Sequence, residues 1–176
     1  MSRTASLPPD EVREAPRRQM RQATTVTIWR RWLIGVGVAL TAFGIAMALA
    51  SGTPLFEPLN RLIDPAFWEA GPPDPGSTGF EAWAFGAWGA TIAGWGVVIT
   101  LVAREAFGQP ERWAWWAVAL GTGLWFILDT GVSLAHGVGF NVAVNLVVLV
   151  LLAPPLIGTR SAAGVRRSRD PRTATR

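Results

Sequence analysis

The chain has 176 residues, half of them apolar and 16% charged, which fits either one soluble domain or a small membrane protein. The absence of cysteine excludes thiol chemistry and disulfides, and the single histidine, His136, excludes paired histidine ligands for a haem or a multi-histidine metal site. We therefore expect no metal ion and no cofactor.

The net charge of +4 is unevenly distributed along the chain. All 16 basic residues are arginine, and 13 of them lie in residues 1–31 and 160–176, beside long uncharged stretches. Basic residues in such positions are typical of membrane proteins and argue against nucleic-acid binding.

Residues 1–28 are rich in arginine and polar residues and contain three prolines, so we predict a mobile cytoplasmic tail, with a short interfacial helix at 11–22 as the alternative. A first membrane span follows at residues 32–50, which are 19 residues without a charge. Arg30 and Arg31 before this apolar run also resemble an export signal, with a cleavage site near Ala50. The length of the run and the three further spans favour a retained helix, and cleavage would leave three spans.

The loop at residues 51–81 has two parts. In FEPLNRLIDPAFW, residues 56–68, apolar residues recur at helical intervals with charged residues between them, which predicts an amphipathic helix. Such a helix can lie flat on the membrane surface as an anchor or cover the mouth of the bundle, and the sequence favours the anchor. GPPDPG, residues 71–76, predicts a stiff linker to the next span.

Three more spans are predicted at residues 82–103, 113–133 and 138–157. Among the four spans, only the third contains an ionisable residue, Asp129. Because helices satisfy their own backbone hydrogen bonds in lipid, we predict an all-α fold. Residues 29–158 then form a four-transmembrane-helix bundle, followed by an arginine-rich mobile tail at 159–176.

The distribution of arginine predicts the orientation of the bundle. Arg104 and Arg112 lie between the second and third spans, whereas the 51–81 loop is mostly acidic and the last turn has no basic residue. Basic residues mark the cytoplasmic side of a membrane. We therefore predict a bacterial plasma membrane protein with both termini inside, whose arginine-rich tails bind anionic lipid head groups.

Seven of the ten tryptophans lie near predicted span ends, where indole rings anchor at the membrane surface. Trp88, Trp95 and Trp125 lie deeper, where they either line a cavity or fill the bundle core. Core filling is the favoured interpretation, since buried aromatic residues generally pack.

Small residues recur every four positions in the second span, which predicts a face on which another helix packs closely. This stripe comprises Ala82, Gly86, Ala90 and Gly94. A possible partner stripe in the first span comprises Gly35, Ala39, Gly44 and Ala48. The same faces can also join two copies of the chain in a homo-oligomer.

The most informative residues surround the last turn. Thr122, Trp125, Asp129, Ser133 and His136 follow spacings of three and four, so they lie on one face of the third span. Two asparagines begin the fourth span just beyond the glycine-containing turn. A short turn therefore predicts one polar pocket that contains Trp125, Asp129, Ser133, His136, Asn141 and Asn145.

Two interpretations of this pocket remain open. In the first, Asp129 binds a proton, a cation or the polar head of a ligand, with His136 as a titrating neighbour. In the second, Ser133 and the asparagines satisfy the carboxylate and hold the two spans together. A hydrolase triad of Ser133, His136 and Asp129 would lack an oxyanion hole, and no other catalytic motif is present, so the sequence favours a protein that is not an enzyme.

In length, long first loop and short last hairpin, residues 30–158 resemble small bacterial four-helix membrane proteins, broadly the DoxX-like group. The run WFILDTGVSLAHGVGFNVAVN, residues 125–145, is where a family signature is expected. This resemblance is one of architecture and implies no activity and no site residue. The leading hypothesis is a membrane protein that binds a small apolar or amphipathic ligand, or conducts a proton or ion, at the outer-leaflet polar pocket. The alternative is a structural or assembly subunit of a membrane complex.

Overall fold

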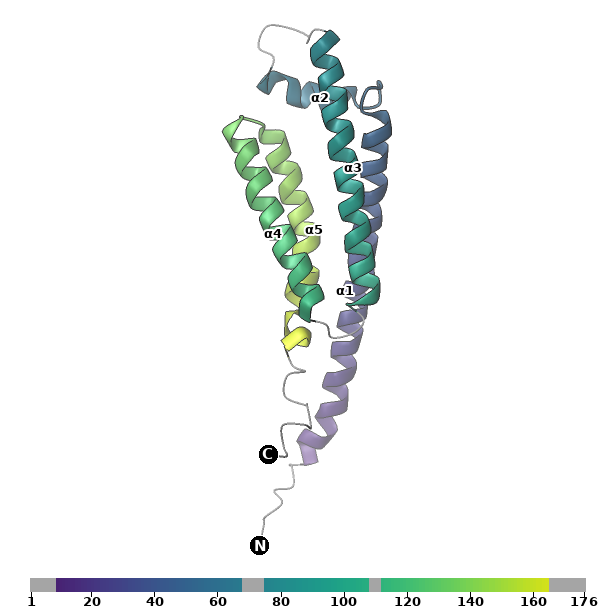
Figure 1. Ribbon diagram of the computed structural model, residues 1–176. Helices are drawn as coiled ribbons and strands as arrows, with labels where there is room; N and C mark the ends of the chain where they lie inside the picture. The colour runs from purple at the N-terminus through teal and green to yellow at the C-terminus, as the bar shows by residue number, and fades with distance from the viewer. Residues whose placement is uncertain (1–8, 68–74, 108–111, 165–176) are drawn as a thin grey trace, which may run out of the picture.

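The computed structural model describes residues 9–67, 75–107 and 112–164, and these residues form helices joined by turns (Figure 1). The elements in chain order are α1 (Pro9–Ala50), α2 (Glu57–Ile63), η1 (Asp64–Ala66), α3 (Pro75–Glu105), α4 (Arg112–Ala135) and α5 (Gly139–Gly164). Four stretches are long and apolar enough to cross a membrane: Met20–Ala50, Gly76–Glu105, Arg112–Ala135 and Gly139–Arg160. The predicted all-α, four-helix architecture of a multi-pass membrane protein is confirmed.

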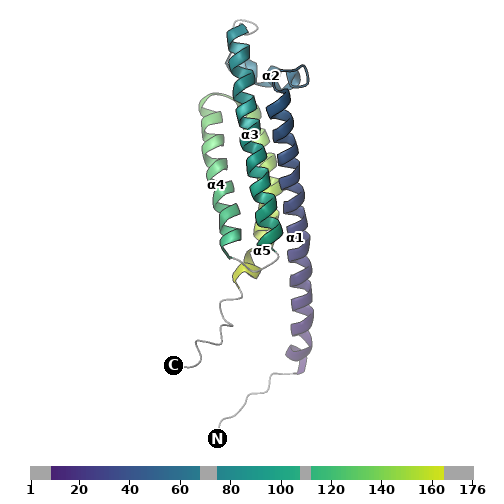
Figure 2. The same ribbon diagram turned by 45° about the vertical axis from the view of Figure 1, so that its right-hand side comes forward.

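The four long helices pack as two pairs, α1 with α3 and α4 with α5 (Figure 1). α5 also packs on α1 (Figure 2), whereas α3 and α4 meet at few residues. Arg30 donates a hydrogen bond of 2.6 Å to the Arg104 carbonyl oxygen, near the point where α3 ends and α4 begins. We name this end of the bundle the Arg30 end, and the opposite end, where α2 lies, the α2 end.

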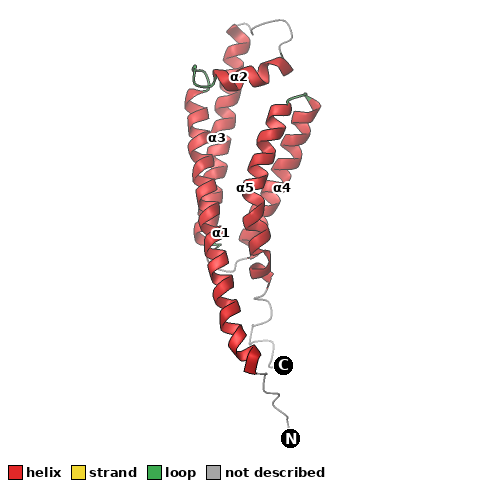
Figure 3. Cartoon of the chain, turned by 180° about the vertical axis from the view of Figure 1, so that it is seen from behind, coloured by secondary structure: helices red, strands yellow, loops and turns green. Residues whose placement is uncertain are grey.

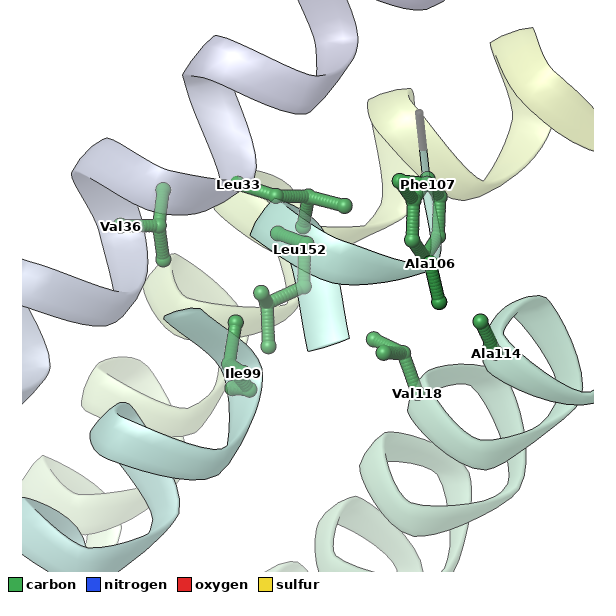
Figure 4. Packing of buried hydrophobic residues seen from close by; sticks show 9 residues of the cluster. Leu33, Val36, Ile99, Ala106, Phe107, Ala114, Val118 and Leu152 are labelled. Atoms are coloured by element: carbon green, nitrogen blue, oxygen red, sulfur yellow. The ribbon is translucent and has the colours of Figure 1, made fainter. Parts of the chain in front are cut away.

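The main apolar core lies at the Arg30 end, where the two pairs converge (Figure 3). It combines buried side chains from all four long helices, and these include Leu33 of α1, Ile99 of α3, Val118 of α4 and Leu152 of α5 (Figure 4). Apolar packing therefore joins the two pairs principally at the Arg30 end.

Close packing of α1 on α3 depends on glycine. The two backbones approach so closely that a Cβ atom has no room at two places. Gly37 meets Gly96 at the first, and Gly44, seven residues later in α1, meets Gly89, seven residues earlier in α3, at the second. A Cβ built on Gly96 would lie 2.6 Å from the Gly37 carbonyl oxygen, and one on Gly89 would lie 2.6 Å from the Gly44 carbonyl oxygen. Small residues permit such contacts in membranes, where van der Waals packing drives helix association.

The predicted small-residue stripes are partly wrong. Gly44 and Ala48 of α1 contact α3 as expected, but Gly35 and Gly94 have no atom within 4 Å of a built Cβ and lie outside the crossing. At about 100° per residue, a stripe that repeats every four residues turns by about 40° per step and leaves the interface after two or three steps. A repeat of seven residues turns by only about 20°, so glycines at that spacing stay in contact.

Two prolines in α5 lead to a hydrogen bond between helices. Pro154 and Pro155 lie inside α5, and because proline has no backbone N–H, Pro155 leaves the Leu151 carbonyl oxygen without its helical donor. The indole Nε1 of Trp32 in α1 donates to that oxygen at 2.8 Å. Trp32, which we predicted as a membrane-surface anchor, thus satisfies a backbone group that lipid cannot satisfy.

We expect Trp32→Phe to lower the free energy of unfolding by about 1–2 kcal/mol, because the phenyl ring keeps apolar contact but leaves the Leu151 oxygen unpaired. The measurement is thermal unfolding in mild detergent. The control is Trp83→Phe in α3. The indole of Trp83 is exposed, and the Leu151 oxygen accepts its hydrogen bond from Trp32 and not from Trp83. An equal loss in both variants would show that the Trp32 hydrogen bond contributes nothing.

Both predicted tails are partly helical. α1 begins at Pro9 and α5 ends at Gly164, whereas we predicted mobile tails at residues 1–28 and 159–176. The part of α1 before the first span contains Glu, Arg, Gln and Met, which have high helix propensity, and these residues extend a helix that the apolar span has already nucleated. The remainder of both tails lies outside the described residues.

α2 and η1 lie across the α2 end (Figures 1 and 3). Phe56, which precedes α2, is buried in a small cluster with Met47 of α1 and Phe85 of α3, and the partly buried residues on the same cluster include Leu59 and Ile63. The apolar side of this amphipathic helix therefore packs on the bundle, which favours the covering role over the surface anchor. Part of the linker predicted after it, residues 71–74, lies outside the described residues, and the remainder begins α3.

Candidate functional site

The turn between α4 and α5 places the predicted polar residues opposite one another. α4 ends at Ala135, and Gly137 adopts a φ of +73°, a left-handed conformation that glycine takes without strain. The Val138 amide donates back to the Ser133 carbonyl oxygen at 2.8 Å, which closes the end of the helix. α5 begins at Gly139, so its first two turns lie against the last two turns of α4.

Four side chains form one hydrogen-bonded network between these helices. Oδ2 of Asp129 accepts a hydrogen bond from Nδ2 of Asn141 at 2.8 Å and another from Nδ2 of Asn145 at 2.6 Å. Asn141 Nδ2 also donates to the Ser133 hydroxyl at 2.8 Å, and that hydroxyl donates to the Asp129 carbonyl oxygen at 2.7 Å. Asn145 and Ser133 are buried, with 1% and 5% of their surface exposed. The structure thus brings together four of the six residues of the predicted pocket.

The carboxylate of Asp129 has no positive partner among the described residues. Both amide donors meet the same oxygen, Oδ2, and within the described part of the chain no side chain donates to Oδ1. Amide dipoles stabilise the charge of a carboxylate but do not compensate it. An ionised Asp129 therefore places an uncompensated negative charge within a helix that is apolar enough to span a membrane.

His136 and Trp125 lie outside this network. Nδ1 of His136 is 3.0 Å from the Val132 carbonyl oxygen, and the centroid of its ring lies 6.3 Å from that of Phe67. The half-buried ring of Trp125 lies beside Phe126, with 6.5 Å between ring centroids. The His136 amide still donates to the Val132 carbonyl oxygen at 3.1 Å, as in a helix, but the imidazole ring does not reach the Asp129 carboxylate.

Two threonines extend the polar face of α4. Thr130 accepts a hydrogen bond of 3.1 Å at its hydroxyl from Asn145 Nδ2. Thr122, two turns deeper, is only 2% exposed, and its hydroxyl has no hydrogen-bond partner among the described residues. The helical spacing of polar residues in the sequence indicated Thr122 as part of this face. The spacing did not indicate Thr130, because Thr130 directly follows Asp129.

An acidic pair, which the sequence did not indicate, lies at the α2 end. The carboxyl groups of Asp64 of η1 and Glu81 of α3 lie close enough to interact electrostatically. The Oδ1 atoms of Asp64 and Asn60 are buried and have no hydrogen-bond partner among the described residues. The pair lies where the segment that covers the α2 end meets α3.

Neither the Asp129 network nor the pair of Asp64 and Glu81 has the composition of a metal or catalytic centre. Within the described residues, no group of three or more His, Asp or Glu side chains is placed to hold a metal ion. The Ser133 hydroxyl bonds to Asn141 and not to His136, so the hydrogen-bonded series of a hydrolase triad is not assembled. The chemistry that the hairpin offers is that of one carboxylate held by amide donors.

No known protein family, curated protein or solved structure matches this chain. The resemblance to the DoxX-like group, which rests on architecture alone, therefore stays a prediction. The function has to be argued from the residues themselves, and the Asp129 network is the polar site that the two helices build together.

Proposed function

We propose that this chain is a multi-pass membrane protein, and not an enzyme, that binds the positively charged group of an amphipathic small molecule at Asp129. The observation that carries the proposal is the lone carboxylate, whose Oδ2 is held by two amide donors while Oδ1 receives no hydrogen bond from the described residues. A charge inside a membrane span is costly unless it is paired. A cationic ligand supplies the missing partner.

The network also fixes the geometry of the carboxylate before a ligand binds. Asn145 donates to Asp129 and Thr130, and Asn141 donates to Asp129 and Ser133, so each amide is held at two points. A preorganised group loses little conformational entropy on binding, which favours affinity. Oδ1 of Asp129 can instead take a proton. The site would then conduct a proton or an ion and would need no organic ligand.

In the orientation that we propose, the Arg30 end faces the bacterial cytoplasm. The described arginines at this end include Arg30, Arg31, Arg104, Arg112 and Arg160. Basic residues mark the cytoplasmic side, so Asp129 then lies in the outer half of the membrane. The arginine-rich ends contact anionic lipid head groups on the cytoplasmic face.

Binding of a lipophilic cation tests the proposed function. The probe is radiolabelled tetraphenylphosphonium, and the proteins, purified in mild detergent, are wild type, Asp129→Asn and Glu57→Gln. Asp129→Asn keeps the shape of the side chain but removes its charge, so it should weaken binding at least about tenfold, since a contact to a charged group contributes about 1.5–3 kcal/mol. Glu57→Gln removes an exposed charge that pairs with Arg61 at the α2 end and should bind like wild type. Equal binding to all three proteins would overturn the proposal.

The second candidate function is that of a structural or assembly subunit. The network supports it as well, because both asparagines of α5 bond to Asp129 of α4 and so join the two helices. A purely structural role predicts that wild type binds no cation and that Asp129→Asn is scarce, dissociated or less stable. A variant that is equally abundant and stable, and that loses only cation binding, favours the ligand site.

A further inference from the structure

A groove of about 710 Å³ runs along the contact between α1 and α5. Its walls include Trp32 and Phe43 of α1 and Leu151 of α5, and Arg31 is the only charged residue that lines it. Both helices contain membrane-spanning stretches, so the groove opens towards lipid. It shares no residue with the Asp129 network.

Small residues form the floor of this groove. Gly35 has no atom within 4 Å of a built Cβ, and Ala39 follows one turn later on the same helix face. Two large rings flank this floor at a spacing of about one turn: Trp32 precedes Gly35, and Phe43 follows Ala39. The hydrogen bond from Trp32 to the Leu151 carbonyl oxygen fixes one of these rings. A concave strip therefore remains after α1 and α5 have packed together.

Arg31 places a positive charge at the Arg30 end of the groove. Its side chain is exposed and has no hydrogen bond or ion pair with the described residues, whereas the neighbouring Arg30 donates to the Arg104 carbonyl oxygen. From Arg31 to Phe43, α1 rises by about 18 Å at about 1.5 Å per residue, which is close to the roughly 15 Å depth of one hydrocarbon leaflet. The groove thus has the length of one lipid chain, with its charge at the level of the head group.

We propose that the groove binds one anionic phospholipid from the leaflet at the Arg30 end. An acyl chain lies between α1 and α5, and the phosphate binds Arg31. A guanidinium group binds phosphate through two parallel hydrogen bonds, so charge complementarity selects an anionic head group. The apolar walls select a lipid over a free phosphate. This site does not depend on the function proposed for Asp129.

Native mass spectrometry of the protein released from nanodiscs tests this site. The nanodiscs contain equal amounts of anionic phosphatidylglycerol and zwitterionic phosphatidylcholine. Wild type should retain one phosphatidylglycerol with about fivefold preference, the ratio expected for one arginine near the membrane surface. Arg31→Gln should lose the preference, and Gly35→Leu, which fills the groove, should lose the retained lipid. Gly94→Leu adds the same side chain at an open position of α3 and should behave like wild type.

Three outcomes would overturn the proposal. The first is equal retention of both lipids by wild type, and the second is a lipid still retained by Gly35→Leu. The third is a wild-type dimer that Gly35→Leu converts to a monomer, because a second copy of the chain would then occupy the groove. Thermal unfolding of Gly35→Leu checks that the variant is folded, as the open space at this position leads us to expect.

Discussion

Gly96→Leu is expected to separate α1 from α3 and to lower the free energy of unfolding by about 3 kcal/mol or more. A Cβ on Gly96 would lie 2.6 Å from both the Gly37 carbonyl oxygen and the Thr41 amide nitrogen, which are backbone atoms that no side-chain rotation can move. The helices can relieve this overlap only by moving apart. Because each helix is rigid, that movement also opens the second contact, between Gly44 and Gly89.

Gly94→Leu is the matched control for this prediction. It lies two residues away on the same helix, with open space around a built Cβ. Leucine favours a helix over glycine by roughly 0.5–1 kcal/mol at either position, so the control should be as stable as wild type or slightly more stable. Thermal unfolding in mild detergent, followed by circular dichroism, compares the two. If both variants unfold at the same temperature, the glycine contacts do not hold α1 to α3.

The number and type of the long helices could be predicted because charge and length identify a membrane span without knowledge of its neighbours. How the spans pack could not be predicted in the same way. α3 carries several sets of small residues, including Gly86, Gly89, Gly94 and Gly96, and only the path of α1 decides which set is in contact. The orientation of α2 could not be predicted either, because its apolar side could face lipid or the bundle. Its packing on the cluster that contains Phe85 shows that this side faces the bundle.

The hairpin network could be predicted because it is local. Asp129 and Asn145 are joined by one short turn, so helix periodicity alone decides which of their neighbours meet. The same periodicity predicted His136 beside Asp129, but its ring lies near Phe67, a contact between distant parts of the chain that helix periodicity does not indicate. The pair of Asp64 and Glu81 could not be predicted, because it depends on how η1 folds back onto α3 through a connection whose geometry the sequence does not determine.

Asn145→Leu is expected to lower the free energy of unfolding by about 1.5–3 kcal/mol, the range for a hydrogen bond to a charged group. Leucine has a side chain of similar size to that of asparagine, but it lacks the amide that donates the 2.6 Å hydrogen bond to Asp129 and the 3.1 Å bond to Thr130. Asn145 is only 1% exposed, so water cannot readily take the place of its amide. The measurement is unfolding in mild detergent at one fixed protein concentration.

The double variant Asp129→Leu/Asn145→Leu separates the effect of the unpaired charge from that of packing. Removing both partners leaves no carboxylate in need of a donor, so the double variant should be more stable than Asn145→Leu although it carries one more substitution. Thr130→Val loses only a neutral hydrogen bond and should cost less than about 1 kcal/mol. If the double variant is instead less stable than Asn145→Leu, Asp129 stabilises the hairpin through other contacts. The bond from Asn145 would then not be the interaction that holds α4 to α5.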